Sequence, residues 1–301
     1  IKKKLIRKFN LDPDEINEKC SLILNALFAS INGSNFKKIN IKISRDYSEM
    51  GIWLEQLISE SSGKENKGVS PIISFIENEK STLKIFTTPD NKGNQEEVLS
   101  IKLTKDTILE DMYFWQLSIV ILCKKINVYP FDEPDVQSSK LNTIKILKEG
   151  KKNIKVGSQF LSSKFSKLLD SNKEKDLLYI NLYIQEKKEL KDKVENLKLL
   201  IKKTLNIDSI TGFGPRYLHS VGQLQKGGPK NIWVLFLYDE NIEKIITNND
   251  GISELKDIYC SQLLGDLMAL KSKDVNTYLI NINSKKSNPF DNIMEEIKEL
   301  S

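Results

Sequence analysis

The only histidine of this 301-residue chain lies in its most unusual segment, GFGPRYLHSVGQLQKGGP, from Gly212 to Pro229. Imidazole is the side chain whose free pKa lies nearest neutral pH, so His219 is the first candidate for proton transfer. Five glycines and two prolines surround it, and they force tight turns whose backbone amides can approach an anionic ligand. Arg216 and Lys226 could bind an anion or stabilise these turns. The alternative for the histidine is a core residue satisfied by backbone groups, but the glycines favour a functional role.

A second segment, GIWLEQLISESSGKENKG at residues 51–68, places an amide and a carboxylate at helical spacing. Gln56 and Glu60 stand four residues apart and would share one face of a helix. A carboxylate at the end of such a helix can act as a general base when partial burial raises its pKa. Spacing alone favours the simpler reading, a solvated helix face followed by a serine-glycine stop.

A third segment, NVYPFDEPDVQSSK at residues 127–140, begins a predicted helix at Pro134. Glu133 and Lys140 are seven residues apart, about two helical turns, and would lie on one face. A lysine at this place could meet a phosphate group or a sugar ring oxygen. By itself, however, Lys140 is more typical of an ordinary surface lysine.

The elements that must position these side chains alternate between strands and helices. Period-two or continuously apolar runs predict strands over residues 38–44, 69–76, 82–87, 177–184, 232–238 and 277–282. Helical periodicity predicts helices over residues 13–31, 51–60, 109–126, 189–205 and 254–270. Such alternation indicates an α/β fold with parallel sheets covered on both faces. A lysine- and glycine-rich stretch from Lys148 to Gly157 predicts a linker or surface loop, which separates domains at residues 1–147 and 148–301.

Composition limits the classes of partner. The chain has 46 basic and 41 acidic residues, a formal charge of +5, and this small, dispersed excess suits an anionic small molecule as well as a nucleic acid. We expect no nucleic-acid partner, because the lysines are not clustered with interleaved aromatics. The three cysteines lack metal-binding or C-x-x-C spacing and predict a reduced, cytoplasmic setting. The most apolar stretch, residues 117–123, is too short for a membrane span.

Taken together, four segments resemble the isomerase part of the bifunctional transaldolase/glucose-6-phosphate isomerase family. They occur in the order that this family shows and cover residues 51–282. They read WLEQLISESSGKENKG, YFWQLSIVILCKKINVYPFDEPDVQSSK, GFGPRYLHSVGQLQKGGP and SQLLGDLMALKSKDV. The resemblance implies a sugar-isomerase-type three-layer αβα sandwich with a mainly parallel sheet, plus a smaller C-terminal α/β region. It also implies interconversion of glucose 6-phosphate and fructose 6-phosphate through an enediol.

The resemblance assigns a role to each candidate residue. Glu60 corresponds to the base that moves a proton between two sugar carbons, and His219 to the group that assists ring opening. Lys140 corresponds to a lysine near the ring oxygen and phosphate, and Gln56 and Glu133 to substrate-binding positions. The implied reaction requires no cofactor and no metal, and the partner is a hexose phosphate.

The chain also departs from the family pattern. Gln116 stands where an acidic residue is expected, and Gln225 where a histidine is frequent. The serine/threonine phosphate loop and arginine of a first sugar-isomerase domain are not found before Gly51. We therefore expect a C-terminal portion of a longer enzyme that is missing an N-terminal sugar-isomerase domain and, in a fused form, a transaldolase domain. A homo-oligomer is compatible with the sequence. The alternative function is a non-catalytic, sugar-phosphate-binding regulatory module.

Overall fold

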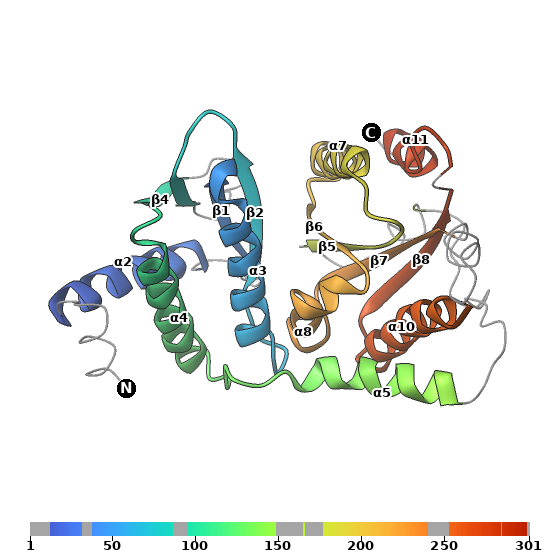
Figure 1. Cartoon of the computed structure of the whole chain (residues 1–301), viewed down its shortest axis with the longest axis horizontal. Helices are drawn as coiled ribbons and strands as arrows, with labels where there is room; N and C mark the ends of the chain where they lie inside the picture. The colour runs from blue at the N-terminus through green and yellow to red at the C-terminus, as the bar shows by residue number, and fades with distance from the viewer. Residues whose placement is uncertain are drawn as a thin grey trace. The chain divides into compact units, whose positions relative to one another are not determined.

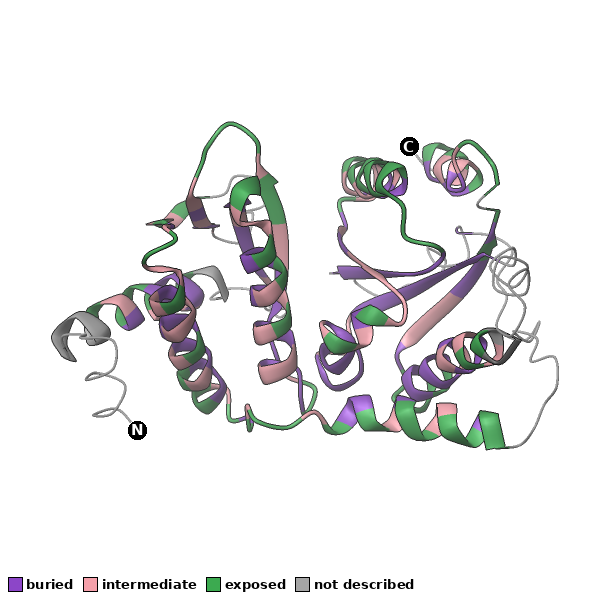
Figure 2. Cartoon of the chain, in the orientation of Figure 1, coloured by how far each residue is buried: buried purple, intermediate pink, exposed green. Residues whose placement is uncertain are grey.

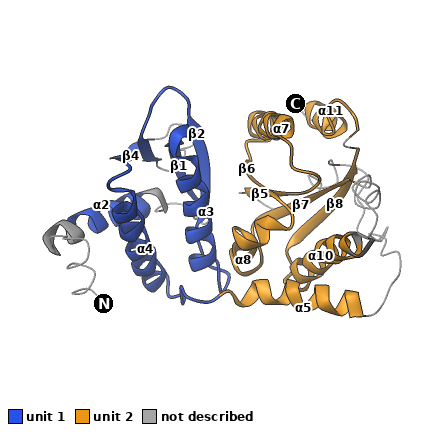
Figure 3. Ribbon diagram, viewed as in Figure 1, with its two compact units in different colours: residues 1–132 blue, residues 133–301 orange. Residues whose placement is uncertain are grey.

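The chain forms two compact units, residues 1–132 and residues 133–301 (Figure 3). The structure, a computed structural model, describes residues 13–31, 38–86, 96–148, 165, 177–239, 253–283 and 285–299. Each unit contains one four-stranded sheet and its own helices (Figure 1). Both units are therefore α/β, and the expected fold class is confirmed at this level.

The first unit has a mixed sheet in the order β2-β1-β3-β4. Its elements are α2 (Pro13–Ile31), β1 (Lys38–Ser44), η1 (Arg45–Tyr47), α3 (Ser48–Ser62), β2 (Ser70–Ile76), β3 (Thr82–Phe86), β4 (Glu97–Lys102) and α4 (Ile108–Lys125). Three isoleucines of β1 at alternate positions are fully buried in the core that α2, α3 and α4 complete. They are Ile39, Ile41 and Ile43. The alternation buries one face of the strand, as a period of two requires.

The expectation of a mainly parallel sheet is wrong for this first unit. Strands β1 and β2 are parallel and are joined through helix α3, but β3 runs antiparallel to β1 and β4 antiparallel to β3. A parallel pair needs a crossover connection of about a dozen residues. The chain between Ile76 and Thr82 is too short for such a crossover, so β3 must run back in the opposite direction.

The second unit has a fully parallel sheet in the order β6-β5-β7-β8. Its elements are α5 (Pro134–Lys148), β5 (Leu177–Tyr183), α7 (Lys188–Leu205), β6 (Asp208–Phe213), η3 (Arg216–His219), α8 (Gly222–Gly227), β7 (Ile232–Asp239), α10 (Ser253–Ser272), β8 (Asn276–Ile282) and α11 (Asp291–Lys298).

Helices cover both faces of this parallel sheet. Helices α7 and α11 pack on one face, and α8, α10 and α5 lie on the other (Figure 1). Every residue of the two central strands, β5 and β7, is therefore buried (Figure 2). Their sequences, LLYINLY and IWVLFLYD, are the continuous apolar runs typical of a strand buried on both sides. The prediction of a parallel sheet covered on both faces is confirmed for this unit.

The boundary between the units differs from the expected one at residues 147/148. Helix α5 packs along α10, so the chain divides at residues 132/133. Gly265 of α10 permits this approach, because a Cβ atom there would lie 2.5 Å from Thr143 Oγ1 of α5. Lys140 is thus carried by the C-terminal unit. Most of the predicted linker, residues 149–157, lies outside the described residues. No helix in the described part of the chain has the length and apolar character needed to cross a membrane.

Candidate functional site

The histidine segment begins at the carboxyl end of β6 and returns across the sheet to β7. Its first turn, η3, ends at His219, whose side chain is exposed, so this residue is not a core histidine. Arg216 of the same turn lies 3.5 Å from the carboxylate of Glu186, which follows β5. Ligands of open parallel sheets bind at this carboxyl edge. The exposed histidine and its neighbouring arginine are therefore placed at the edge where ligands are expected.

A fully buried carboxylate anchors both ends of the histidine segment. Asp266 of α10 lies 2.5 Å from the ammonium group of Lys226, and neither side chain is exposed. The same carboxylate accepts a hydrogen bond from the hydroxyl of Tyr217 and one of 2.8 Å from Ser139 of α5. Tyr217 precedes His219 and Lys226 follows it, so one acidic side chain fixes the segment on either side of the histidine. We call these four residues the Asp266 cluster.

Burial, together with the charge of Asp266, raises the pKa of Tyr217 well above its ordinary value. The phenol therefore remains protonated at neutral pH and donates to the carboxylate. Lys226 also donates to the carbonyl of Gly222 at 3.3 Å. A buried charge requires such pairing and hydrogen bonding to be tolerated. The cluster is therefore a positioning element rather than a solvent-accessible reaction site.

Two further buried contacts hold helix α8. Gln223 accepts a 3.0 Å hydrogen bond from the backbone of Asp135 and donates to its carboxylate at 2.7 Å. Lys273, which follows α10, lies 2.5 Å from the same carboxylate. Gln225 exchanges two 3.0 Å hydrogen bonds with Asn181 of β5. Gln225 is thus a buried partner of the central strand β5.

In the first unit, Gln56 and Glu60 lie on the same face of α3, as their spacing predicts. The amide of Gln56 donates a 3.2 Å hydrogen bond to the carboxylate of the half-buried Glu60. Helix α3 ends at Ser62, whose hydroxyl accepts from the backbone of Val69 at the entrance to β2. The carboxylate therefore lies in the last turn of a helix whose end is tied to the sheet.

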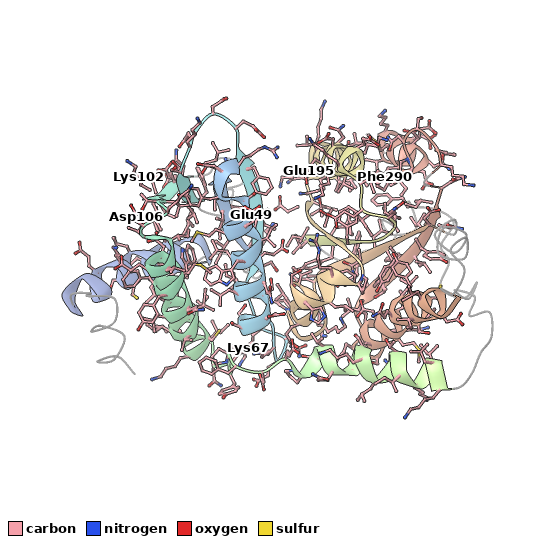
Figure 4. The ribbon with its side chains drawn as sticks, in the orientation of Figure 1. Glu49, Lys67, Lys102, Asp106, Glu195 and Phe290 are labelled. Carbon is pink, nitrogen blue, oxygen red and sulfur yellow. The ribbon has the colours of Figure 1, made fainter. Side chains whose placement is uncertain are left out.

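The turn after α3 also holds the beginning of the third segment. Lys64 is almost fully buried, donates at 2.6 Å to the carbonyl of Tyr129 and lies 3.1 Å from Asp132. Lys67 donates to the carbonyl of Asn127 at 3.2 Å, and Figure 4 shows it at the end of the helix opposite to Glu49. Lys64 and Lys67 therefore connect residues 51–68 with residues 127–140, two segments that lie far apart in the sequence.

In the second unit, the ammonium of Lys140 lies 3.5 Å from the carboxylate of Glu133 at the start of α5. This ion pair confirms that the two residues share one face. Both are partly exposed to solvent, so a ligand can reach them. Of the five predicted site residues, Glu60 and Gln56 belong to the first unit, and Glu133, Lys140 and His219 to the second.

No protein-family model matches the chain, and no curated protein matches it at a significant level. Within the described ranges, no group of three or more histidine, cysteine, aspartate or glutamate side chains is arranged to hold a metal ion. The expected resemblance to the isomerase family therefore depends on the four sequence segments alone.

Sequence reasoning missed the residues that make these contacts. They are Lys64, Asp135, Ser139, Tyr217 and Asp266. Each has an ordinary side chain at an unremarkable local spacing, and its partner is distant in sequence. The one available signal was that all five lie inside the four segments that the sequence analysis had already selected.

Proposed function

We propose that the complete protein containing this chain is a glucose-6-phosphate isomerase, acting on hexose 6-phosphates. One observation supports this proposal above the others. The four segments that resemble the family are linked by buried polar contacts, through Lys64 in the first unit and through Asp135 and Asp266 in the second. Groups buried at this cost are retained where they fix a geometry.

In the proposed reaction, the Glu60 carboxylate takes the proton from the carbon beside the carbonyl and returns it to the neighbouring carbon. The carbonyl oxygen gains a proton as the enediol forms and keeps it, and the hydroxyl oxygen on the neighbouring carbon loses its proton as the other carbonyl appears, so the isomers differ only in the positions of hydrogen atoms. Gln56 orients the carboxylate by its amide hydrogen bond. A carboxylate with a restricted orientation needs less reorganisation in the transition state.

Ring opening precedes this transfer and needs a second proton donor and acceptor. His219 is exposed on a turn held by the Asp266 cluster, and imidazole can exchange a proton near neutral pH. Lys140, paired with Glu133, would hold the ring oxygen or the phosphate by its charge. We also propose that the first unit belongs to a sugar-isomerase-type sandwich, of which α3 and the β1–β2 parallel pair form a part.

The test is a coupled assay of fructose 6-phosphate conversion by the complete protein and by the Glu60→Gln variant. We expect the variant to lose at least about a thousandfold in kcat with an unchanged circular dichroism spectrum, since it removes the base and not only its hydrogen bond. Glu49→Gln, at the exposed first turn of the same helix, is the matched control and should retain full activity. Unchanged turnover in Glu60→Gln would refute the assignment of the base.

A further inference from the structure

A cationic hollow lies at the carboxyl edge of the parallel sheet, outside all four segments of the isomerase resemblance. Residues that follow β5, residues of the first turns of α7 and residues that follow β8 line a cavity of about 250 Å³. The lining residues are Gln185, Lys187, Glu189, Leu190, Lys193, Lys286, Ser287 and Pro289. None of them has a role in the proposed isomerisation.

Three lysines gather at this hollow from two separate elements, against one carboxylate among its lining residues, Glu189. Lys193 donates to the carbonyl of Ser287, and Lys286 donates to the amide oxygen of Asn292 at 3.2 Å. These acceptors are uncharged, so they fix the two ammonium groups without neutralising them. Like charges brought together in this way cost free energy until an anion binds between them.

The hollow also lies at a place in the fold where open parallel sheets commonly bind ligands. In the sheet, β6 pairs with one side of β5 and β7 with the other, so the strand order reverses beside β5. Open parallel sheets bind ligands outside the carboxyl ends of strands at such a point. The first turn of α7 adds backbone N–H groups there, and Lys187 at its N-cap makes no side-chain capping bond to the described helix.

We propose that this lysine hollow binds a small phosphate monoester. A phosphate dianion matches the excess of positive charge and offers several acceptor oxygens to the lysines and to the start of α7. A cavity of about 250 Å³ holds several times the roughly 30 Å³ of one water, which leaves room for a small organic group beside the phosphate. The site would give the second unit a ligand of its own, whether or not the isomerase proposal holds.

The experiment is calorimetric titration of the full chain with inorganic phosphate and with methyl phosphate at constant ionic strength. The test variant is Lys187→Gln/Lys286→Gln, which leaves Lys193 in its contact with Ser287. The control is Lys203→Gln/Lys285→Gln, which removes the same charge from the same two regions but no residue that lines the hollow. We expect the test variant to bind both phosphates at least about tenfold more weakly, and the control to bind them like the wild type.

Acetate distinguishes a phosphate site from a general anion site. It carries half the charge and fewer oxygens, so we expect it to bind at least about tenfold more weakly than methyl phosphate. The proposal is overturned if acetate binds as well, if both double variants weaken binding equally, or if the wild-type chain binds neither phosphate. Circular dichroism of each variant verifies that the fold is retained.

Discussion

Breaking the buried ion pair in the Asp266 cluster should destabilise the second unit far more than removing both of its charges. The ammonium of Lys226 and the carboxylate of Asp266 are 2.5 Å apart and fully buried. Removal of one partner from such a pair leaves an uncompensated charge and costs about 3–5 kcal/mol. We expect Lys226→Met and Asp266→Asn each to lower the free energy of unfolding by about this amount.

The double variant, Lys226→Met/Asp266→Asn, leaves no charge in the Asp266 cluster. Tyr217 and Ser139 donate to different oxygens of Asp266, so the asparagine oxygen can accept from one hydroxyl while its NH2 group donates to the other. The methionine occupies the volume of the lysine stem. We therefore expect a loss of only about 1–2 kcal/mol. The double variant should be more stable than either single variant, which is the reverse of additive behaviour.

Urea denaturation followed by circular dichroism measures these differences, and hydrogen–deuterium exchange assigns them to a unit. Peptides of β5 and β7 should lose protection in the single variants, while peptides of β1 and β3 should not change, because they belong to the other core. If a single variant does not fold while the double variant folds, the same conclusion follows: the unpaired buried charge is more destabilising than the loss of both charges. Additive losses, or a loss below about 1 kcal/mol for Lys226→Met, would refute the buried pair.

Three further predictions test burial in both units. Burial raises the pKa of the Cys123 thiol to about 11, and all three cysteines are buried, so Ellman's reagent should react only with the denatured chain; rapid labelling of the native protein would contradict this. Burial also raises the pKa of Asp111, so ionisation of this carboxyl group opposes folding at neutral pH. Asp111→Asn should therefore raise the melting temperature at about pH 7. The gain should vanish near pH 3, where the carboxyl group is protonated in both the folded and the unfolded chain. In Gly265→Ala, a methyl group 2.5 Å from Thr143 Oγ1 should lower the urea stability by about 1–3 kcal/mol, and an unchanged midpoint would contradict the close helix crossing.

The elements with a clear hydrophobic period could be predicted from the sequence. The run KINIKIS at residues 38–44 alternates strictly, and it forms β1 with the predicted bounds. The predictions for β5, β7 and α7 differ from the structure by one residue at most. These elements bury a complete face or stripe, so their local pattern already reports their environment.

Elements with a weak local pattern were not predicted. The strand β6 has the sequence DSITGF, which is half-buried and has a glycine as its penultimate residue, and α8 has the sequence GQLQKG, with a glycine at each end. Both elements are stabilised by partners that are distant in sequence, such as Asp135 for Gln223. Local propensity cannot register such contacts, because tertiary packing overrides it.

In the candidate site, too, contacts between residues close in sequence could be predicted and contacts between distant residues could not. Helical spacing predicted the pairs Gln56–Glu60 and Glu133–Lys140, and both form. The carboxylate that positions the histidine segment, Asp266, is 40 residues beyond Lys226 and 127 beyond Ser139. No periodic pattern connects residues at those separations.

The central claim is that Glu60 carries a proton between two carbons of a hexose phosphate. Its most direct test is to incubate the complete protein with fructose 6-phosphate in D2O and to measure deuterium at C2 of the glucose 6-phosphate formed by NMR. The account predicts deuterium at C2 with the wild-type protein and none above background with Glu60→Gln. Deuterium incorporation by the variant at the wild-type rate would contradict it.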